Sequence, residues 1–183
     1  MTWARTLSIV SAPHEDGLVV ATRLRDTAFK RELEKLEAGA GNLSIDGPFG
    51  SMTLHSRSER PAVFLAGGIG VTPFVSMIRH ALNEKLPHQI TLLYSNRTKD
   101  DAAYFDELIG LADGNGRVTV VPTFTKEGGK RIDEGVIREN VADVTAPIYY
   151  IAGPPQFVKT MQDLLEKLGV EDDDVRFEEF AGY

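Results

Sequence analysis

From residue 61 onward, short apolar runs alternate with longer segments in which apolar residues recur every three or four positions. The short runs predict buried strands, and the longer amphipathic segments predict helices. The strands are expected at 62–66, 89–95, 117–124, 147–152 and 175–180, and the helices at 72–84, 99–112, 133–140 and 154–169. Apolar strands separated by helices are typical of a parallel sheet covered on both faces. Residues 61–183 are therefore predicted to form a doubly wound α/β domain with five parallel strands.

The first 60 residues follow a different pattern. Apolar and polar residues alternate over 5–13 and 17–25, which predicts two strands, and 26–39 predicts one helix. Two further short strands are expected within 42–54, on either side of a Gly-Pro-Phe-Gly turn. Four strands with one face to bury make a thin domain. Residues 1–60 are therefore expected to be a small β-rich region that forms only part of a larger unit.

Composition and charge exclude several classes of function. The chain has no cysteine, which excludes disulfides, thiolate nucleophiles and cysteine-ligated clusters. The four histidines are scattered, so no metal site is expected and each is predicted to lie on the surface or in a loop. The net charge is −7, and residues 1–60 hold eight basic and eight acidic residues, so the excess belongs to 61–183 and argues against nucleic-acid binding. The acidic run 171–174 is expected to be a solvated loop.

The lengths of the apolar runs bear on where in the cell the protein is expected. None approaches the roughly 20 residues that cross a bilayer. The first residues also lack the basic and then apolar layout of a signal peptide. We therefore expect a cytoplasmic protein that does not insert into a membrane.

Two turns between a predicted strand and a predicted helix carry the candidate chemistry. The first is the sequence LAGGIGVTPF at 65–74, where glycines precede a helix expected to begin near Thr72 with Pro73 at its first position. Glycines allow close approach of a ligand, and a helix N-terminus favours a pyrophosphate. The pattern is neither a P-loop nor Gly-x-Gly-x-x-Gly, so both a dinucleotide site and a tight structural turn remain open. The second turn is AGPP at 152–155, which by itself indicates only a helix start.

These turns and several other stretches together resemble the ferredoxin–NADP reductase superfamily of flavin- and nicotinamide-linked oxidoreductases. The stretches that carry the resemblance are RTLS at 5–8, TAFKREL at 27–33, GPFG at 47–50, GGIGVTPF at 67–74, AGPP at 152–155 and EEF at 178–180. The family places a flavin-binding β-barrel before an NAD(P)-binding domain. By this resemblance, residues 1–60 are expected to be a truncated flavin-binding barrel that lacks its first strands, and residues 61–183 a complete NAD(P)-binding domain.

The resemblance assigns roles to residues of the first 60. Arg5 would pair with the flavin pyrophosphate, and Ser8 would lie near flavin N5 as a catalytic residue. Leu7 stands where the family often has an aromatic residue that stacks on the flavin. Further cofactor-binding residues would be Thr22 and the start of the predicted helix at Thr27, Ala28 and Phe29, with Asp26 as its expected N-cap.

In the second region, the resemblance implies that the first turn cradles a nicotinamide nucleotide and that the second turn faces it. The residues concerned are Gly68, Gly70, Val71, Thr72, Gly153 and Pro154. Glu178 matches a catalytic carboxylate near the hydride path, and Phe180 or Tyr183 would cover the flavin. Arg97 offers a partner for a 2′-phosphate, but Asp100 and Asp101 oppose one, so NADH and NADPH both remain open.

The expected function is hydride transfer from NADH or NADPH to FAD, with FMN possible, followed by electron delivery to a separate acceptor. Ferredoxin, a ferric chelate, free flavin and a quinone are candidate acceptors. The alternative is a non-catalytic nucleotide-binding subunit that has lost stable flavin binding and works only in a complex. A second copy or a partner chain is expected to complete the barrel, because unpaired strand edges invite pairing.

Overall fold

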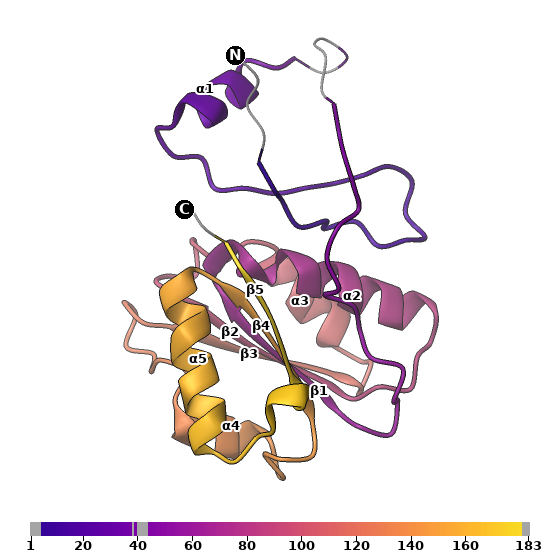
Figure 1. Cartoon of the computed structure of the whole chain (residues 1–183), viewed down its shortest axis with the longest axis vertical. Coiled ribbons are helices and arrows are strands. Elements are labelled where there is room, and N and C mark those ends of the chain that lie inside the picture. Colours follow the sequence, from indigo (N-terminus) through magenta and orange to yellow (C-terminus); the bar gives the residue numbers. More distant parts are fainter. Residues whose placement is uncertain (1–4, 38, 40–43, 181–183) are drawn as a thin grey trace.

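A computed structural model describes residues 5–37, 39 and 44–180. Its centre is a sheet of five parallel strands in the order β3-β2-β1-β4-β5, which Figure 1 shows. The strands are β1 (Ala62–Gly67), β2 (Ile90–Asn96), β3 (Val118–Phe124), β4 (Ile148–Gly153) and β5 (Val175–Glu179). The apolar runs of the sequence predict all five strands to within about two residues at each end.

Helices cover both faces of the sheet. Helices α2 (Thr72–Asn83) and α3 (Phe105–Ala112) lie on one face, and α4 (Glu134–Asn140) and α5 (Pro155–Lys167) lie on the other. Each strand divides its side chains between two cores, because successive residues of a strand point to opposite faces. Phe64 and Tyr150 pack on the α2 side, whereas Leu65 and Ile151 pack on the α5 side. The predicted doubly wound α/β fold is confirmed.

From β1 the chain adds β2 and β3 on one side of the sheet, and then β4 and β5 on the other. The strand order therefore reverses between β1 and β4. In open parallel sheets, ligands bind outside the carboxyl ends of the strands at such a point. Figure 1 shows the N-terminal region, defined here as the described residues before β1, lying over this end of the sheet. The fold therefore brings most of the N-terminal region to the expected ligand-binding edge, while Arg60, just before β1, lies at the opposite end of the sheet.

The N-terminal region contains less regular structure than its sequence pattern predicts. In place of the four expected strands, the described residues before β1 show one antiparallel bridge, between Ile9 and Val20. The Val10 N–H donates to the Val19 carbonyl at 2.8 Å, and no longer ladder forms. The alternating pattern was present, but a strand also needs a paired neighbour, and two short segments supply too few cross-strand contacts.

The helix of the N-terminal region, α1, is shorter than expected. It spans Ala28–Glu34, and its N-cap is Thr27, whose hydroxyl accepts a hydrogen bond from the Lys30 N–H at 3.3 Å. The prediction that Asp26 caps this helix is wrong, because the Asp26 carboxylate pairs with Arg31 instead.

Helix α3 also begins later than predicted. Residues 99–104 form turns, and the helix starts at Phe105 because Tyr104 has a left-handed backbone with φ of 58°. Ala103, which falls within the predicted helix 99–112, therefore lies before the observed one. Before α2, Gly68–Val71 form a 3-10 turn, so Pro73 is the second residue of that helix rather than its first.

The structure refines two expectations about charged and polar residues. His55 and His88 lie in loops, as predicted, but both are buried: the His55 ring nitrogens contact the Tyr150 hydroxyl and the Arg60 carbonyl, and His88 contacts the His55 carbonyl. The acidic run 171–174 is not merely a solvated loop. Its last residue, Asp174, accepts two hydrogen bonds from the Arg60 guanidinium, at 2.6 and 2.7 Å, which fasten the chain before β1 to the start of β5.

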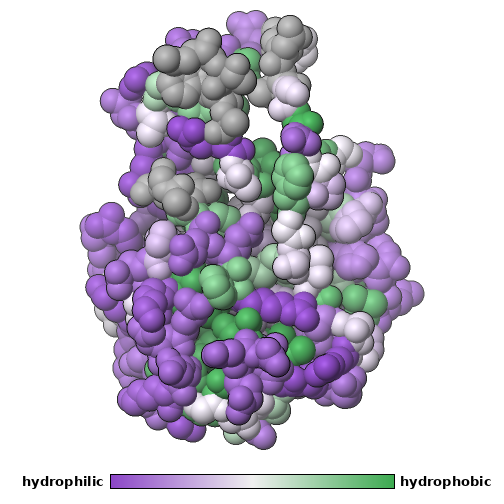
Figure 2. Space-filling model, in the orientation of Figure 1, coloured by the Kyte–Doolittle hydropathy of each residue, from purple (hydrophilic) through white to green (hydrophobic). Residues whose placement is uncertain are grey.

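Exposed apolar side chains gather in the N-terminal region, where Figure 2 shows hydrophobic surface among hydrophilic residues. A monomeric protein usually covers such side chains, so this surface is a candidate for contact with a partner. The residues concerned are Leu18, Val19, Val20, Leu24, Leu36, Ile45 and Phe49. Among the helices of the described residues, none is long and apolar enough to cross a membrane.

Candidate active site at the carboxyl edge of the sheet

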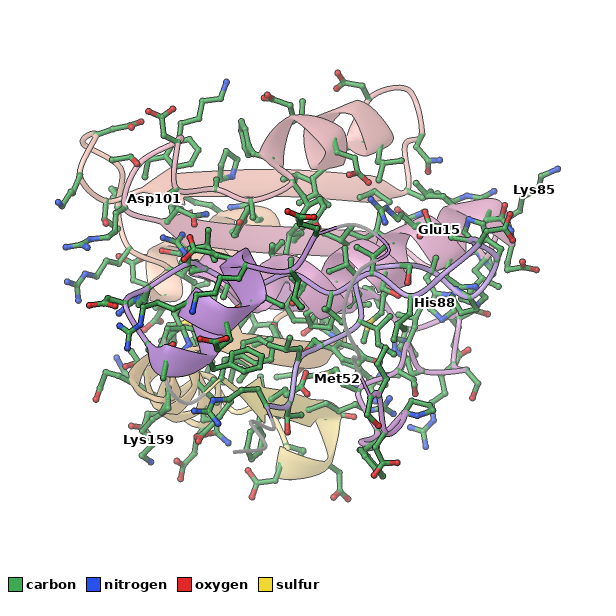
Figure 3. The ribbon with its side chains drawn as sticks, turned by 90° about the horizontal axis from the view of Figure 1, so that it is seen from above. Glu15, Met52, Lys85, His88, Asp101 and Lys159 are labelled. Carbon is green, nitrogen blue, oxygen red and sulfur yellow. The ribbon has the colours of Figure 1, made fainter. Side chains whose placement is uncertain are left out.

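The N-terminal region is fastened to the sheet domain on two sides. On one side, Arg79 of α2 donates to Glu15 at 3.2 Å and to the Val10 carbonyl at 3.4 Å. On the other, Arg23 pairs with Asp101 at 3.1 Å. Figure 3 looks onto this end of the molecule and shows Glu15 and Asp101 on opposite sides of it. The N-terminal region is thereby held across the carboxyl ends of the strands.

A hydrogen bond joins the two residues predicted to be catalytic. The Ser8 hydroxyl donates to Glu178 Oε2 at 2.9 Å, although 170 positions separate the two residues in the chain. Glu178 is half-buried on β5, opposite Ala152 at the end of β4. A hydroxyl bonded to a carboxylate is held in one orientation by a charge-assisted bond. The fold thus brings Ser8 and Glu178 together beside the point where the strand order reverses.

The glycines of the first turn have different physical reasons to be glycine. A Cβ on Gly70 would lie 2.5 Å from the Ala152 carbonyl carbon, and closer still to its oxygen. A Cβ on Gly67 would lie 2.8 Å from the Phe157 ring, and one on Gly153 would lie 2.9 Å from it. Gly67 and Gly70 of the first turn, and Gly153 of the second, therefore allow close packing among β1, the 3-10 turn, β4 and α5, so glycine at these positions is structural.

Gly68 differs from the other glycines of the turn. Its φ is +57°, and the only described atom within 4 Å of an added Cβ is Arg23 Nη2 at 3.8 Å. Of the other residues expected to cradle a nucleotide, Val71 and Thr72 are buried, whereas Pro154 is exposed. Gly68 is therefore the glycine of this turn whose backbone a ligand can approach.

A groove of about 470 Å³ opens beside Gly68. It runs between the N-terminal region and the loop after β2, and Thr22, Arg23, Ile69, Asp100, Asp101 and Tyr104 line it. The Arg23 guanidinium holds the pKa of Asp101 below its usual range, chiefly through their hydrogen bond. Thr22, predicted to bind a cofactor among the residues of the first 60, lines this groove, whereas sequence reasoning missed Arg23 and Tyr104, since a lone arginine in an alternating segment gives no sign of its partner.

Comparisons with known proteins show the family of this chain. Residues 64–163, more than half of the chain, match the oxidoreductase NAD-binding domain family. The ferredoxin–NADP reductase B of Sorangium cellulosum is 32% identical over 195 residues, covering 96% of this chain and 78% of that protein. This chain belongs to the ferredoxin–NADP reductase-like family of oxidoreductases.

Other members of the family are longer than this chain. The reductase component of propane 2-monooxygenase from Rhodococcus jostii is 28% identical, over 76% of this chain and 40% of that protein. Several of these relatives are matched over less than half of their length. A ferredoxin–NADP⁺ reductase from Neisseria gonorrhoeae with bound FAD and NADP has the same fold, with a TM-score of 0.74, 20% identity, and coverage of 96% of this chain and 79% of that one.

Within this reductase-like fold, the residues predicted to bind the flavin pyrophosphate lie apart from the glycine turn. The Arg5 guanidinium lies over the Phe29 ring, 5.6 Å from its centroid, and Thr27 and Ala28 begin the same helix. Figure 1 shows α1 at the outer end of the N-terminal region, away from the sheet. Leu7 is half-buried. The structure thus brings Arg5 and Phe29 together, separately from the nucleotide turn.

Phe180, one of the two residues expected to cover the flavin, has a buried side chain in this reductase-like chain. Phe180 is 7% exposed, packs in the core on the α2 side, and donates its N–H to the Gly153 carbonyl at 3.0 Å. Its backbone instead ties the end of β5 to the second turn. Tyr183, the other residue expected to cover the flavin, lies outside the described residues.

Arg97, predicted to bind a 2′-phosphate, is exposed directly after β2, and its carbonyl accepts the Lys126 N–H at 2.8 Å.

Proposed function

We propose that this chain is an NAD(P)H-dependent flavin reductase that passes electrons to a separate acceptor. The observation that carries the proposal is the hydrogen bond between Ser8 and Glu178, which lies at the carboxyl edge of the sheet on β5, next to β4. Relatives named as a ferredoxin–NADP reductase and as reductase components of oxygenases support a protein as acceptor. The cytoplasmic location and a domain boundary at residue 60 remain predictions.

The residues present fit a nicotinamide dinucleotide. Gly68 leaves an open backbone beside a groove of about 470 Å³, and the Arg23 guanidinium borders both. A bound nicotinamide would supply the hydride and a bound flavin the atom that accepts it. Arg5 and the start of α1 would hold the flavin phosphates, as the family resemblance implies.

The chain's own contribution is alignment and a fixed proton position. The Ser8 hydroxyl donates its proton to Glu178, so both lone pairs of the serine oxygen can accept a bond from a ligand. The Glu178 carboxylate, as the acceptor, fixes the direction of the Ser8 hydroxyl. Fixing these groups before the reaction lowers the entropy cost of reaching the reactive geometry.

The test measures NADH and NADPH oxidation by the purified protein with FAD or FMN added and ferricyanide as acceptor. Ser8→Ala and Glu178→Gln should each lower kcat by about tenfold or more, with little change in the dissociation constants of either cofactor. Glu179→Gln is the matched control, since Glu179 is exposed and follows Glu178 on the same strand. Wild-type activity that survives in both site variants would refute the proposed roles.

A second candidate function is a nucleotide-binding subunit that needs another chain. The single bridge between Ile9 and Val20 and the exposed apolar side chains of the N-terminal region favour it. A second copy or a different chain would pair with this region and complete the flavin site. A protein that binds NAD(P)H but oxidises none with added flavin, until it is mixed with a partner, would establish this candidate. Light scattering over a range of concentrations tests self-association directly.

A further inference from the structure

Arg23 lies between Asp101, which offers it a carboxylate and a backbone carbonyl, and the open backbone of Gly68. Its Nη1 donates to Asp101 Oδ1 at 3.1 Å, and its Nη2 donates to the Asp101 carbonyl at 2.6 Å. The other oxygen of the carboxylate, Oδ2, accepts a bond from the Thr98 hydroxyl at 3.1 Å. These contacts use one hydrogen of each terminal nitrogen and leave others of the guanidinium available for a ligand.

The open side of this guanidinium faces Gly68. Arg23 Nη2 lies 3.8 Å from the position of a Cβ on Gly68, and Gly67 and Gly70 are closed by packing. An anion on the Gly68 backbone would therefore be within reach of Arg23. It would also lie near Asp101 and Asp100, which line the same groove. The site thus combines the Arg23 guanidinium with two acidic residues, of which Asp101 already forms an ion pair with it.

We propose that Arg23 and Asp101 form a competing ion pair in the dinucleotide site, in which Asp101 limits the affinity of Arg23 for the pyrophosphate over Gly68. The inference rests on the proposed function. Binding of the pyrophosphate draws the guanidinium from the carboxylate, and the like charge of Asp101 opposes the incoming phosphates. Because Arg23 belongs to the N-terminal region, an occupied nucleotide site also changes one of the contacts that hold this region in place.

Asp101 is ionised under ordinary conditions, since Arg23 and the Thr98 hydroxyl both stabilise the charged form and lower its pKa. An asparagine at this position keeps the shape and the backbone carbonyl contact but removes the charge. Removal of Asp101 and removal of Arg23 should therefore act in opposite directions on nucleotide affinity. If the ion pair had only a structural role, both substitutions would change nucleotide affinity in the same direction, because the loss of either residue would loosen the groove.

The experiment titrates the full chain with NADH and, separately, with ADP-ribose, which carries the same pyrophosphate without nicotinamide. Asp101→Asn should lower the dissociation constant of both ligands by about threefold to tenfold, as expected for one partly screened like charge. Arg23→Ala should raise both by about tenfold or more. Arg25→Ala and Asp106→Asn are the matched controls, since both residues are exposed and neither lies in the groove. Circular dichroism verifies that each variant is folded.

The possible results separate this inference from the proposed function. Weaker binding by Asp101→Asn, or unchanged binding by Arg23→Ala in a wild type that binds NADH, overturns the ion-pair inference alone. A change in FAD affinity in place of NADH affinity assigns the groove to the flavin and also overturns it. A folded wild type that binds neither NADH nor ADP-ribose overturns both this inference and the nucleotide site of the proposed function.

Discussion

Gly70 offers the sharpest test of how the glycine turn is built. In a change of Gly70 to alanine, the new methyl group would lie 2.5 Å from the Ala152 carbonyl carbon and 2.7 Å from the Gly153 Cα. All the obstructing atoms belong to the backbone of β4, which is paired on both sides and cannot shift locally. The substitution should therefore damage the fold before it affects any ligand.

The size of the effect follows from overpacking. Inserting a methyl group into a rigid core costs about 1–3 kcal/mol, and a clash with backbone belongs at the upper end of that range. For a protein of this length, about 3 kcal/mol corresponds to a loss of about 6–12 °C in the unfolding midpoint. Gly110 is the matched control, because it is exposed in α3 with nothing described within 4 Å of its added Cβ. Gly110→Ala should stabilise the protein by up to about 1 kcal/mol.

The assay is urea unfolding followed by circular dichroism, with NADH titration of each folded variant. Gly68→Ala completes the series: its Cβ has room, and the positive φ costs about 1–2 kcal/mol. We expect Gly68→Ala to weaken NADH binding and Gly70→Ala to lower the free energy of unfolding. A stable Gly70→Ala variant with weakened NADH binding would refute this division, because it would mean that Gly70 faces the ligand after all.

Two further predictions concern the opposite end of the sheet. Arg60→Ala removes both bonds to Asp174 and those to the carbonyls of Ala146 and Pro147, and should lower the free energy of unfolding by about 2–3 kcal/mol, with Asp174→Asn costing about half as much. Urea unfolding measures both, and equal stability of Arg60→Ala and wild type would contradict the prediction. The pKa of His55 is lowered, chiefly by burial, so the unfolded chain binds a proton more readily than the folded one. Stability should therefore fall as pH drops below about 6.5, by up to about 1.4 kcal/mol per pH unit, and His55→Gln should reduce that slope.

The sequence by itself determined the elements of the sheet domain. Runs such as 62–66 and 147–152 are apolar throughout, and a segment so short and so apolar is stable only as a strand buried on both faces. Because these preferences act within a few residues, they can be read without knowledge of the fold.

The sequence also located the candidate site, since two glycine turns between strand and helix mark the carboxyl edge of a parallel sheet. It could not distinguish Gly68 from Gly70, because the difference lies in what surrounds each one: Arg23 at the first, and the backbone of Ala152 at the second. The same holds for His55, whose position in the chain indicates a loop, while its burial follows from the Tyr150 side chain of a distant strand.

Only the tertiary structure decided which distant residues meet. Ser8 reaches Glu178, and Arg23 reaches Asp101, because the N-terminal region crosses the edge of the sheet. Neither pair has a local signature, since a side chain's partner depends on strand order and chain path rather than on neighbouring residues. The alternating segments before β1 show the reverse case. Their pattern favours strands, but strands form by pairing, and one bridge is all that the described neighbours supply.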